Sequence, residues 1–336
     1  MFAYLAKYKP QAPYVIVSSK PDEDNRDESN WTPVTNFILL GLSDSPTQQA
    51  GLFSLFLTMY FVAVLGNGRI VAIIIRDRHL HTPMYFFLGN LSFVDICFTS
   101  AIAPKMLQNM LAEVRTISFE GCMAQLYAFC FTATTEIYLL AIMGFDRYFA
   151  ICNPLRYTYV MSRVLCISLV SGSWLFVSLH SLLHISMVSR FDFCGSNLIQ
   201  HFFCDLPPLL KLACSDTTTY EWLVFTEGSV VSMSPFVLAV ASYVAIISTI
   251  LKIPSEERRL RAFSTCSSHL TVVTLFFGTI FFTYFRPFSA NTLDQGRMVT
   301  VMYTIVTPML NPFNYSLRNN DVKGALRNAF NRKISV

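Results

Sequence analysis

The sequence predicts an all-α membrane protein, a bundle of seven transmembrane helices followed by a short amphipathic helix in the cytoplasm. Of its 336 residues, 53% are hydrophobic and 14% are charged, whereas soluble domains carry about 25% charged residues. The apolar residues form stretches long enough to cross a hydrocarbon core of about 30 Å, which takes about 20 helical residues. Their periodicity is helical and lacks the alternation of an outer-membrane barrel. The seven stretches are residues 52–76, 84–104, 122–146, 164–186, 223–251, 263–285 and 298–316.

The positions of Lys and Arg predict the orientation of the bundle, because basic residues favour the cytoplasmic side. The segment from Trp31 to Gly51, just before the first span, contains neither residue. We therefore expect an extracellular segment at 1–51, a seven-transmembrane domain at 52–316 and a cytoplasmic tail at 317–336. The basic residues follow the first, third and fifth spans and continue into the tail: Arg76, Arg78, Arg156, Arg163, Lys252, Arg258, Arg259, Arg261, Arg318, Lys323, Arg327, Arg332 and Lys333.

The first 30 residues are polar and lack the apolar core of a cleavable signal peptide, so the first span is expected to act as the targeting signal. Asn30-Trp31-Thr32 is a glycosylation sequon on the expected outer side, where the modification is possible. The alternative is an unused sequon, because Pro33 follows it.

Four of the nine cysteines lie on the expected outer side, at Cys122, Cys194, Cys204 and Cys214. Thiols oxidise outside the cell, and four cysteines permit three pairings. The competing hypothesis is a metal site, because His201 and Cys204 form an H-x-x-C pattern; we favour two disulfides. The remaining cysteines lie in or near the membrane or cytoplasm and are expected to be free: Cys97, Cys130, Cys152, Cys166 and Cys266.

Few polar groups lie inside the predicted spans, and each is a functional candidate because its insertion costs free energy. Asn67, Asp95, Glu136 and Asn311 lie at mid-depth in four different spans. If they face inward, they form one cluster that can hold water or a small cation, or a purely structural hydrogen-bond network. Arg69 follows Asn67 by two residues and should point elsewhere, with its side chain reaching towards the headgroups.

An acid and a base stand together at the cytoplasmic end of the third span, as Asp146 and Arg147. Asp146 can neutralise Arg147, so that the pair stays partly buried until another group competes for the arginine. Such a breakable ion pair is suited to a conformational switch. The alternative is an interfacial anchor that only fixes the depth of the helix.

After the seventh span, Val322, Leu326 and Phe330 recur every four residues with basic residues beside them. This spacing predicts an amphipathic helix on the cytoplasmic surface of the bilayer. The tail contains no cysteine for palmitoylation, so burial and charge alone would hold the helix there.

Several motifs occur in a fixed order, and together they resemble the odorant (olfactory) receptors among the rhodopsin-like G-protein-coupled receptors. The resemblance covers about residues 30–328. The motifs are "FILLGLSDSP" before the first span, "GN" at 66–67, "LHTPMYFFLGNLSFVD" at 80–95, "AIMGFDRYFAICNPLRY" at 141–157, "SY" at 242–243, "RAFSTCSSHL" at 261–270 and "PMLNPFNYSLRN" at 308–319.

The chain departs from the family pattern at several positions. Gly144-Phe145 stands where the family usually has Ala-Tyr, and Arg261 replaces a Lys and keeps its charge. Phe277 lacks the hydroxyl of the usual Tyr, which bears on activation. Asn314 replaces an aliphatic residue, and residues 1–25 extend beyond the usual N-terminus.

The resemblance implies a plasma-membrane receptor that binds small odorants between the third, fifth and sixth spans. The residues themselves show an apolar stripe with one hydroxyl on the third span and an aromatic face on the sixth, suited to a small apolar ligand. Glu227, in the outer half of the fifth span, is expected either to lie in this pocket or to face the outer loop. The predicted ligand-binding residues are Phe129, Cys130, Ala133, Thr134, Ile137, Glu227, Phe277, Ile280, Phe281 and Tyr284.

The resemblance also implies activation of a stimulatory heterotrimeric G protein and a rise in cyclic AMP. It favours the pairings Cys122–Cys204 and Cys194–Cys214 among the three possible sets. No cofactor, catalytic residue or nucleic-acid partner is expected. The alternatives are a related receptor for a lipid, peptide or metabolite, and a transporter. The residues expected to form the G-protein switch are Asp146, Arg147, Tyr148, Tyr243, Asn311, Pro312 and Tyr315.

Overall fold

The structure is a computed structural model that describes residues 34–42, 45–194, 196–284, 292–318 and 324. The sequon at Asn30 and the amphipathic tail helix lie outside the described residues and stay predictions. The side chains of Phe281, Tyr284 and Tyr315 are also outside the description, although their backbone is helical.

Five helices of the described chain are each long and apolar enough to cross a membrane. Most of them continue several residues beyond the predicted apolar stretches, because a helix does not end where the hydrocarbon ends. They are α1 (Pro46–Arg76), α2 (Pro83–Leu111), α3 (Phe119–Cys152), α5 (Arg163–Val188) and α7 (Thr218–Leu251).

Two further segments complete the bundle. The sixth is α8 (Glu256–Tyr284), whose apolar part is Cys266–Ile280. The seventh is one continuous helical segment made of α9 (Thr292–Val301), the π-helical turn η3 (Met302–Val306) and α10 (Thr307–Arg318). The predicted seven-transmembrane fold is therefore confirmed.

Local sequence explains where the helices start. Pro46 and Pro83 occupy the first turns of α1 and α2, where the missing N–H costs nothing. The hydroxyl of Ser118 accepts a hydrogen bond from the N–H of Gly121 at the start of α3, and Ser162 does the same for Leu165 at the start of α5. Such caps satisfy N–H groups that have no partner within the helix.

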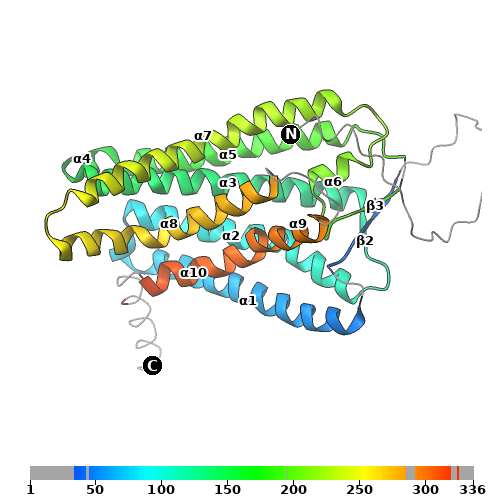
Figure 1. Cartoon of the computed structure of the whole chain (residues 1–336), viewed down its shortest axis with the longest axis horizontal. Helices are drawn as coiled ribbons and strands as arrows, with labels where there is room; N and C mark the ends of the chain where they lie inside the picture. Colours follow the sequence, from blue (N-terminus) through cyan, green and yellow to red (C-terminus); the bar gives the residue numbers. More distant parts are fainter. Residues whose placement is uncertain (1–33, 43–44, 195, 285–291, 319–323, 325–336) are drawn as a thin grey trace, which may run out of the picture.

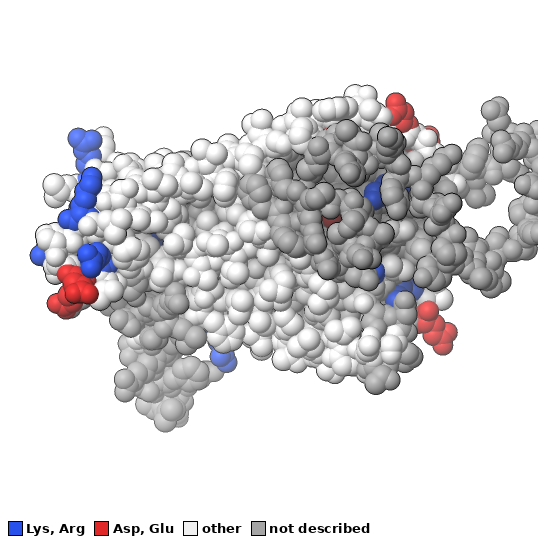
Figure 2. Space-filling view, in the orientation of Figure 1, with Lys and Arg blue, Asp and Glu red and all other residues white. Residues whose placement is uncertain are grey.

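Three short helices connect the long ones: η2 (Arg78–Leu80), α4 (Pro154–Val160) and α6 (Leu206–Leu210). α3 packs against α2, α5, α7 and α8, so it is the central helix of the bundle. The middle of the face in Figure 2 carries almost no charge, and the Lys, Arg, Asp and Glu side chains lie mainly towards the two ends. This distribution suits a molecule whose middle is surrounded by lipid.

A small three-stranded sheet at one end of the bundle was not predicted. β1 (Asn36–Leu39) pairs antiparallel with β2 (Thr116–Ser118) and parallel with β3 (Leu198–Ile199). We call this sheet, together with residues 189–217, the lid. The strands form because the N-terminal segment inserts between two loops that neither precede nor follow it directly.

The lid has an apolar core of its own. Phe37 and Ile199 have no exposed surface, and the ring of Phe37 packs edge-on against Phe193 at 5.5 Å. Burying a side chain of this kind contributes about 1.5–3 kcal/mol. The core reaches Cys122 and Leu126 on α3, so the lid is packed onto the bundle.

Candidate functional site

The predicted ligand-binding residues of α3 share one apolar cluster beneath the lid. Phe129 and Ile137 are buried, and Cys130 and Ala133 pack against the same cluster. Thr134 is half-buried on the same helix. These residues recur at helical spacing, so they line one face of α3. The predicted stripe on the third span is therefore continuous in the structure.

α8 contributes the opposite wall. Phe277 is buried, Ile280 packs against the same cluster as Phe129, and the ring of Phe277 lies 5.0 Å from that of Phe236 on α7. Residues from α3, α7 and α8 thus meet in one apolar region.

The lid closes this region from above. The ring of Phe203 lies 4.9 Å from Phe129, and Tyr303 of η3 lies 6.4 Å from Phe129 on the other side. The π-helical turn changes the direction in which side chains of the seventh segment point. Tyr303 lies within this turn and points into the bundle. Sequence reasoning missed Phe203 and Tyr303, because neither belongs to a periodic pattern that points to a ligand.

Gln125 of α3 fixes the lid above the predicted pocket. Its carbonyl oxygen accepts a hydrogen bond from the backbone N–H of Cys204 at 3.0 Å, and its amide donates to the carbonyl of Ala101 on α2 at 2.9 Å. One side chain therefore joins the lid to two helices.

Two hollows of the structure lie outside the predicted ligand site. One is between Leu39–Leu42, Met106 and Phe202, and the other is an open depression beside Lys105, Gly121 and Ala128.

The lid contains both disulfides that the resemblance implies. Cys122 is bonded to Cys204, with their Cα atoms 5.5 Å apart, and Cys194 is bonded to Cys214, with 5.8 Å between the Cα atoms. The other five cysteines are free, as expected. A metal site at His201 and Cys204 is wrong, because the sulfur of Cys204 is in a disulfide and cannot act as a thiolate ligand.

Two titratable groups are buried in the lid near this disulfide. Burial, with a smaller contribution from Arg297, lowers the pKa of His201 to about 3, so its imidazole is neutral at physiological pH. Burial raises the pKa of Asp205 to about 6, although its carboxylate accepts a hydrogen bond from the N–H of Leu206 at the start of α6.

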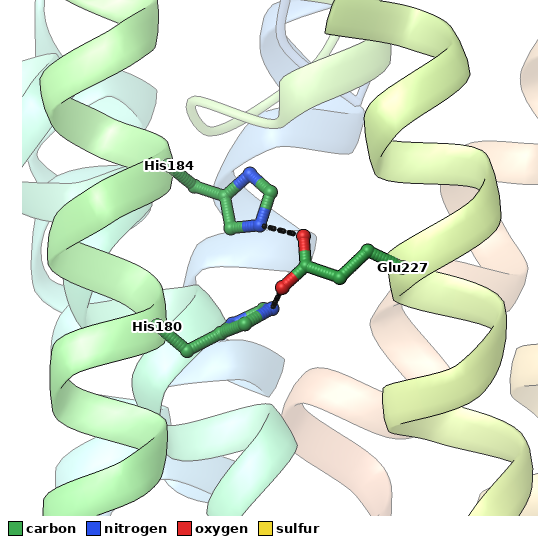
Figure 3. A group of neighbouring side chains, drawn as sticks. All are labelled: His180, His184 and Glu227. Carbon is green, nitrogen blue, oxygen red and sulfur yellow. Dashed lines mark hydrogen bonds and ion pairs between the residues drawn. The ribbon is translucent and has the colours of Figure 1, made fainter.

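Glu227 contacts α5, whereas a residue of the predicted ligand pocket would face the region between α3, α7 and α8. Its two carboxylate oxygens are 2.8 Å and 2.9 Å from the Nε2 atoms of His180 and His184 on α5. Figure 3 shows the carboxylate pointing across from α7 to these two rings. The sequence analysis missed both histidines; their i, i+4 spacing on the fourth span was the signal that could have found them.

The four predicted polar residues in the bundle do come together. Asn67, Asp95, Glu136 and Asn311 are all buried. The amide of Asn311 donates to Asp95 at 2.8 Å, and the amide of Asn67 donates to the carbonyl of Pro308 at 2.9 Å. Arg69 is exposed on α1, away from Asn67. Binding of water or a small cation by this cluster stays a prediction.

The expected ion pair between Asp146 and Arg147 does not form among the described residues. Buried Asp146 instead accepts a hydrogen bond from the hydroxyl of Tyr157 on α4 at 2.9 Å, and the guanidinium of Arg147 contacts the sulfur of Met84 on α2. Neighbouring side chains on a helix point in different directions, about 100° apart, which separates the two charges. Burial and the adjacent Asp146 raise the pKa of the Tyr157 phenol.

Other predicted switch residues lie around the same end of the bundle. The hydroxyl of Tyr243 on α7 is hydrogen-bonded to Nδ1 of His269 on α8, and Asn153 donates to the hydroxyl of Tyr148 at 3.3 Å. Pro312, which follows Asn311 in α10, faces Gly66 of α1. Tyr157 and His269 were not predicted, because their roles depend on contacts between different helices.

The comparisons with known proteins agree with the motifs. The olfactory receptor family model matches residues 56–333. Olfactory receptor 1E16 of Mus musculus is 51% identical over 310 residues, which are 92% of this chain and 99% of that protein. Olfactory receptor 1L4 of Homo sapiens is 51% identical over 307 residues, 91% of this chain and 99% of that protein. Olfactory receptor 1 of Rattus norvegicus is 50% identical over 310 residues, 92% and 99% of the two chains. The chain belongs to the olfactory receptor family, a family of receptors rather than enzymes.

Proposed function

We propose that the chain is an odorant receptor of the plasma membrane. It binds small volatile molecules between α3, α7 and α8 beneath the lid, and it activates a stimulatory heterotrimeric G protein that raises cyclic AMP. The lid is the extracellular end, and the end that carries Arg147 is cytoplasmic. Family membership and the positions of Lys and Arg along the sequence support this orientation.

The observation that carries the proposal is a polar group on an otherwise apolar wall. The hydroxyls of Thr132 and Thr135 are hydrogen-bonded to backbone carbonyls of α3 four residues earlier. The hydroxyl of Thr134 has no partner among the described residues, and Thr134 lies one helical turn from both Cys130 and Ile137 of the apolar cluster. An apolar wall with one available hydroxyl suits a small ligand with one polar atom.

Binding beneath the lid would be transmitted along α3, which runs from the lid at Phe119 to the opposite end at Cys152. A ligand shifts the population of conformations only if it binds one of them more tightly. In the proposed mechanism the ligand favours a state in which Arg147 exchanges its contact with Met84 for one with the G protein. Asn67, Asp95 and Asn311 lie between the two ends and link α1 and α2 to α10, and Glu136 of α3 is buried at a similar depth.

The proposal is tested by expressing the chain in cells with a cyclic AMP reporter and screening a panel of volatile alcohols, aldehydes, ketones and hydrocarbons. Thr134→Val keeps the shape of the side chain and removes the hydroxyl. For oxygen-containing agonists we expect a potency loss of about tenfold, the equivalent of one net hydrogen bond, and no loss for hydrocarbons.

The matched control is Thr135→Val, because the hydroxyl of Thr135 is already hydrogen-bonded to the carbonyl of Phe131. This variant should keep the potency of the parent at equal surface level. The absence of any agonist that raises cyclic AMP in a receptor present at the cell surface would contradict the proposed function. Flux of a solute without cyclic AMP would favour a transporter.

A further inference from the structure

Three side chains with metal-binding atoms converge between α5 and α7 (Figure 3). His180 and His184 are four residues apart on α5, so both rings lie on the face turned to α7. Glu227 approaches from α7. One ligand atom from each of the three residues lies within 4.8 Å of the other two.

The ligand distances of this cluster can be compared with those of a tetrahedral metal site. Metal–nitrogen and metal–oxygen bonds of about 2.0–2.2 Å place neighbouring ligand atoms roughly 3.3 Å apart. The nitrogen–oxygen distances are 2.8 Å and 2.9 Å, each to a different oxygen of the carboxylate, and the ligand atoms lie within 4.8 Å of one another, so a bound ion would draw the three side chains closer together. Two imidazoles and a carboxylate form a donor set used for Zn²⁺ in proteins that leaves a fourth position open.

Tyr220 is hydrogen-bonded to the ring nitrogen of His184 that does not face Glu227. Its hydroxyl lies 3.1 Å from Nδ1 of His184, and its side chain is buried. A hydroxyl can either donate or accept. It can therefore donate to Nδ1 while Nε2–H is bonded to Glu227, and accept from Nδ1–H when Nε2 binds a metal. Metal-binding histidines usually have such an outer partner, which fixes the ring and its tautomer.

The charge of the cluster also favours a cation. Glu227 lies within α7, in the part of the chain predicted to cross the membrane, where an ionised carboxylate is costly. About a third of its side chain is left uncovered by the rest of the protein. A divalent cation bound between the two rings and the carboxylate would neutralise an ionised Glu227. Imidazole with carboxylate suits Zn²⁺ and Cu²⁺ among the available divalent metals.

We propose that His180, His184 and Glu227 form a binding site for a divalent transition-metal ion, Zn²⁺ or Cu²⁺, that joins α5 to α7. Both helices pack against α3, so the bound ion fixes two neighbours of the helix that carries the predicted ligand-binding face. Metal binding itself does not depend on the proposed odorant function. Its effect on the odorant response rests on that function.

The test uses the full chain purified in detergent and titrated with ZnCl₂ against a competing fluorescent chelator. A His79→Gln/His81→Gln background removes two exposed histidines at the other end of the bundle. We expect one tight site in this background. Glu227→Gln or His184→Gln should weaken binding by more than about 100-fold, and Tyr220→Phe by about 10–100-fold, the range for outer partners. Co²⁺ in place of Zn²⁺ should give the visible absorption of a tetrahedral site.

The matched control is Glu221→Gln, the same substitution on the same helix at a carboxylate bonded to Thr217. It should leave the Zn²⁺ affinity unchanged. Thermal unfolding without metal separates loss of the site from loss of the fold. Equal Zn²⁺ affinity in the parent, Glu227→Gln and His184→Gln proteins would overturn the proposal. If the site binds Zn²⁺ while no odorant raises cyclic AMP, the metal site stands and the odorant function fails.

Discussion

The two ends of α3 are held in different ways. At the lid end, the Cys122–Cys204 disulfide, the sheet and an apolar core attach the helix to its surroundings. At the opposite end, α3 packs Tyr148, Ile151 and Cys152 against α7 and α8, and the attachments of Asp146 and Arg147 are one hydrogen bond to Tyr157 and one contact with Met84. Covalent bonds and packed cores resist rearrangement, whereas single hydrogen bonds can be exchanged for others at small cost. The difference indicates that the lid end is fixed covalently, whereas the two charged side chains at the opposite end have contacts that can be exchanged.

The largest expected effect comes from opening the lid. Cys122→Ser removes a bond that closes a long loop, with a sequence separation of 82, worth about 4–5 kcal/mol in the chain-entropy model. We expect a lower unfolding temperature and loss of surface expression. Cys194→Ser, with a separation of 20, should cost less, about 3 kcal/mol. Cys97→Ser is the control, because Cys97 is free. A Cys122→Ser protein as stable as the Cys97→Ser protein would show that packing alone fixes the lid.

At the other end, Arg147→Ala should abolish the cyclic AMP response to agonist while the surface level stays near that of the parent. The side chain is only half-buried, and its contact with Met84 contributes little to stability. Arg156→Ala, at an exposed basic residue on α4, is the control for general loss of positive charge. If the Arg147→Ala receptor signals like the parent, Arg147 is an interfacial anchor and the contrast between the two ends is lost.

The fixed end should also respond to pH through Asp205. Its pKa of about 6 in the folded lid exceeds the ordinary value of 3.8, so the folded state binds the proton more tightly. The contribution of Asp205 to the free energy of unfolding is therefore most favourable below pH 3.8. It is lost as pH rises through 6, and the loss is at most about 3 kcal/mol. His201 has the opposite effect. Its pKa is about 3 in the folded lid, against an ordinary value of 6.5, so the folded protein loses stability as pH falls below 6.5.

Unfolding of the detergent-solubilised protein between pH 4 and pH 7 separates the two groups. Asp205→Asn keeps a side-chain oxygen for the N–H of Leu206 and removes the ionisation. This variant should gain stability relative to the parent as pH rises. A constant difference between variant and parent across the range would mean that Asp205 does not titrate in the lid.

A smaller effect is expected from Tyr157→Phe, which removes the hydrogen bond to buried Asp146. A buried acceptor that loses its donor costs about 1–3 kcal/mol. Thermal unfolding should show this loss, and the exposed Tyr159 on the same helix provides a matched Tyr→Phe control. Identical unfolding of the two variants would mean that water replaces the tyrosine hydroxyl.

The sequence predicts the parts of this structure that depend on periodicity and composition. The seven spans follow from apolar stretches, and the cluster of Asn67, Asp95 and Asn311 follows from their equal depth. The lid sheet and the His180–Glu227 contact could not be predicted in the same way. They depend on which segments meet and on the rotation of each helix about its axis, and a single sequence leaves both undetermined.

The same limit applies to Asp146 and Arg147, which are adjacent in the chain and yet have different partners. Adjacency suggested an ion pair. The partners that replace it, Tyr157 and Met84, come from α4 and α2, and only the packed bundle brings them near.

The smallest effect is expected at Gly144, where the olfactory receptors usually have Ala. A Cβ atom there would lie 3.8 Å from Cα of Ala239 and 3.9 Å from Cβ of Ser242, ordinary contact distances, so α3 and α7 have room for a methyl group. Gly144→Ala should leave surface level and agonist potency unchanged and should raise stability by up to about 1 kcal/mol, because Gly is the weaker helix former.

Gly66→Ala is the matched substitution at a close contact. Its Cβ would lie 2.9 Å from Cγ of Pro312, and a rigid proline ring cannot rotate away, so α1 and α10 must separate at a cost of about 1–3 kcal/mol. Unfolding temperatures of the two variants provide the comparison. A destabilised Gly144→Ala protein would mean that α3 and α7 are as tightly packed at Gly144, towards the end of α3 that carries Arg147, as α1 and α10 are at Gly66. In that case movement at this end would require the helices to separate, rather than single hydrogen bonds to exchange.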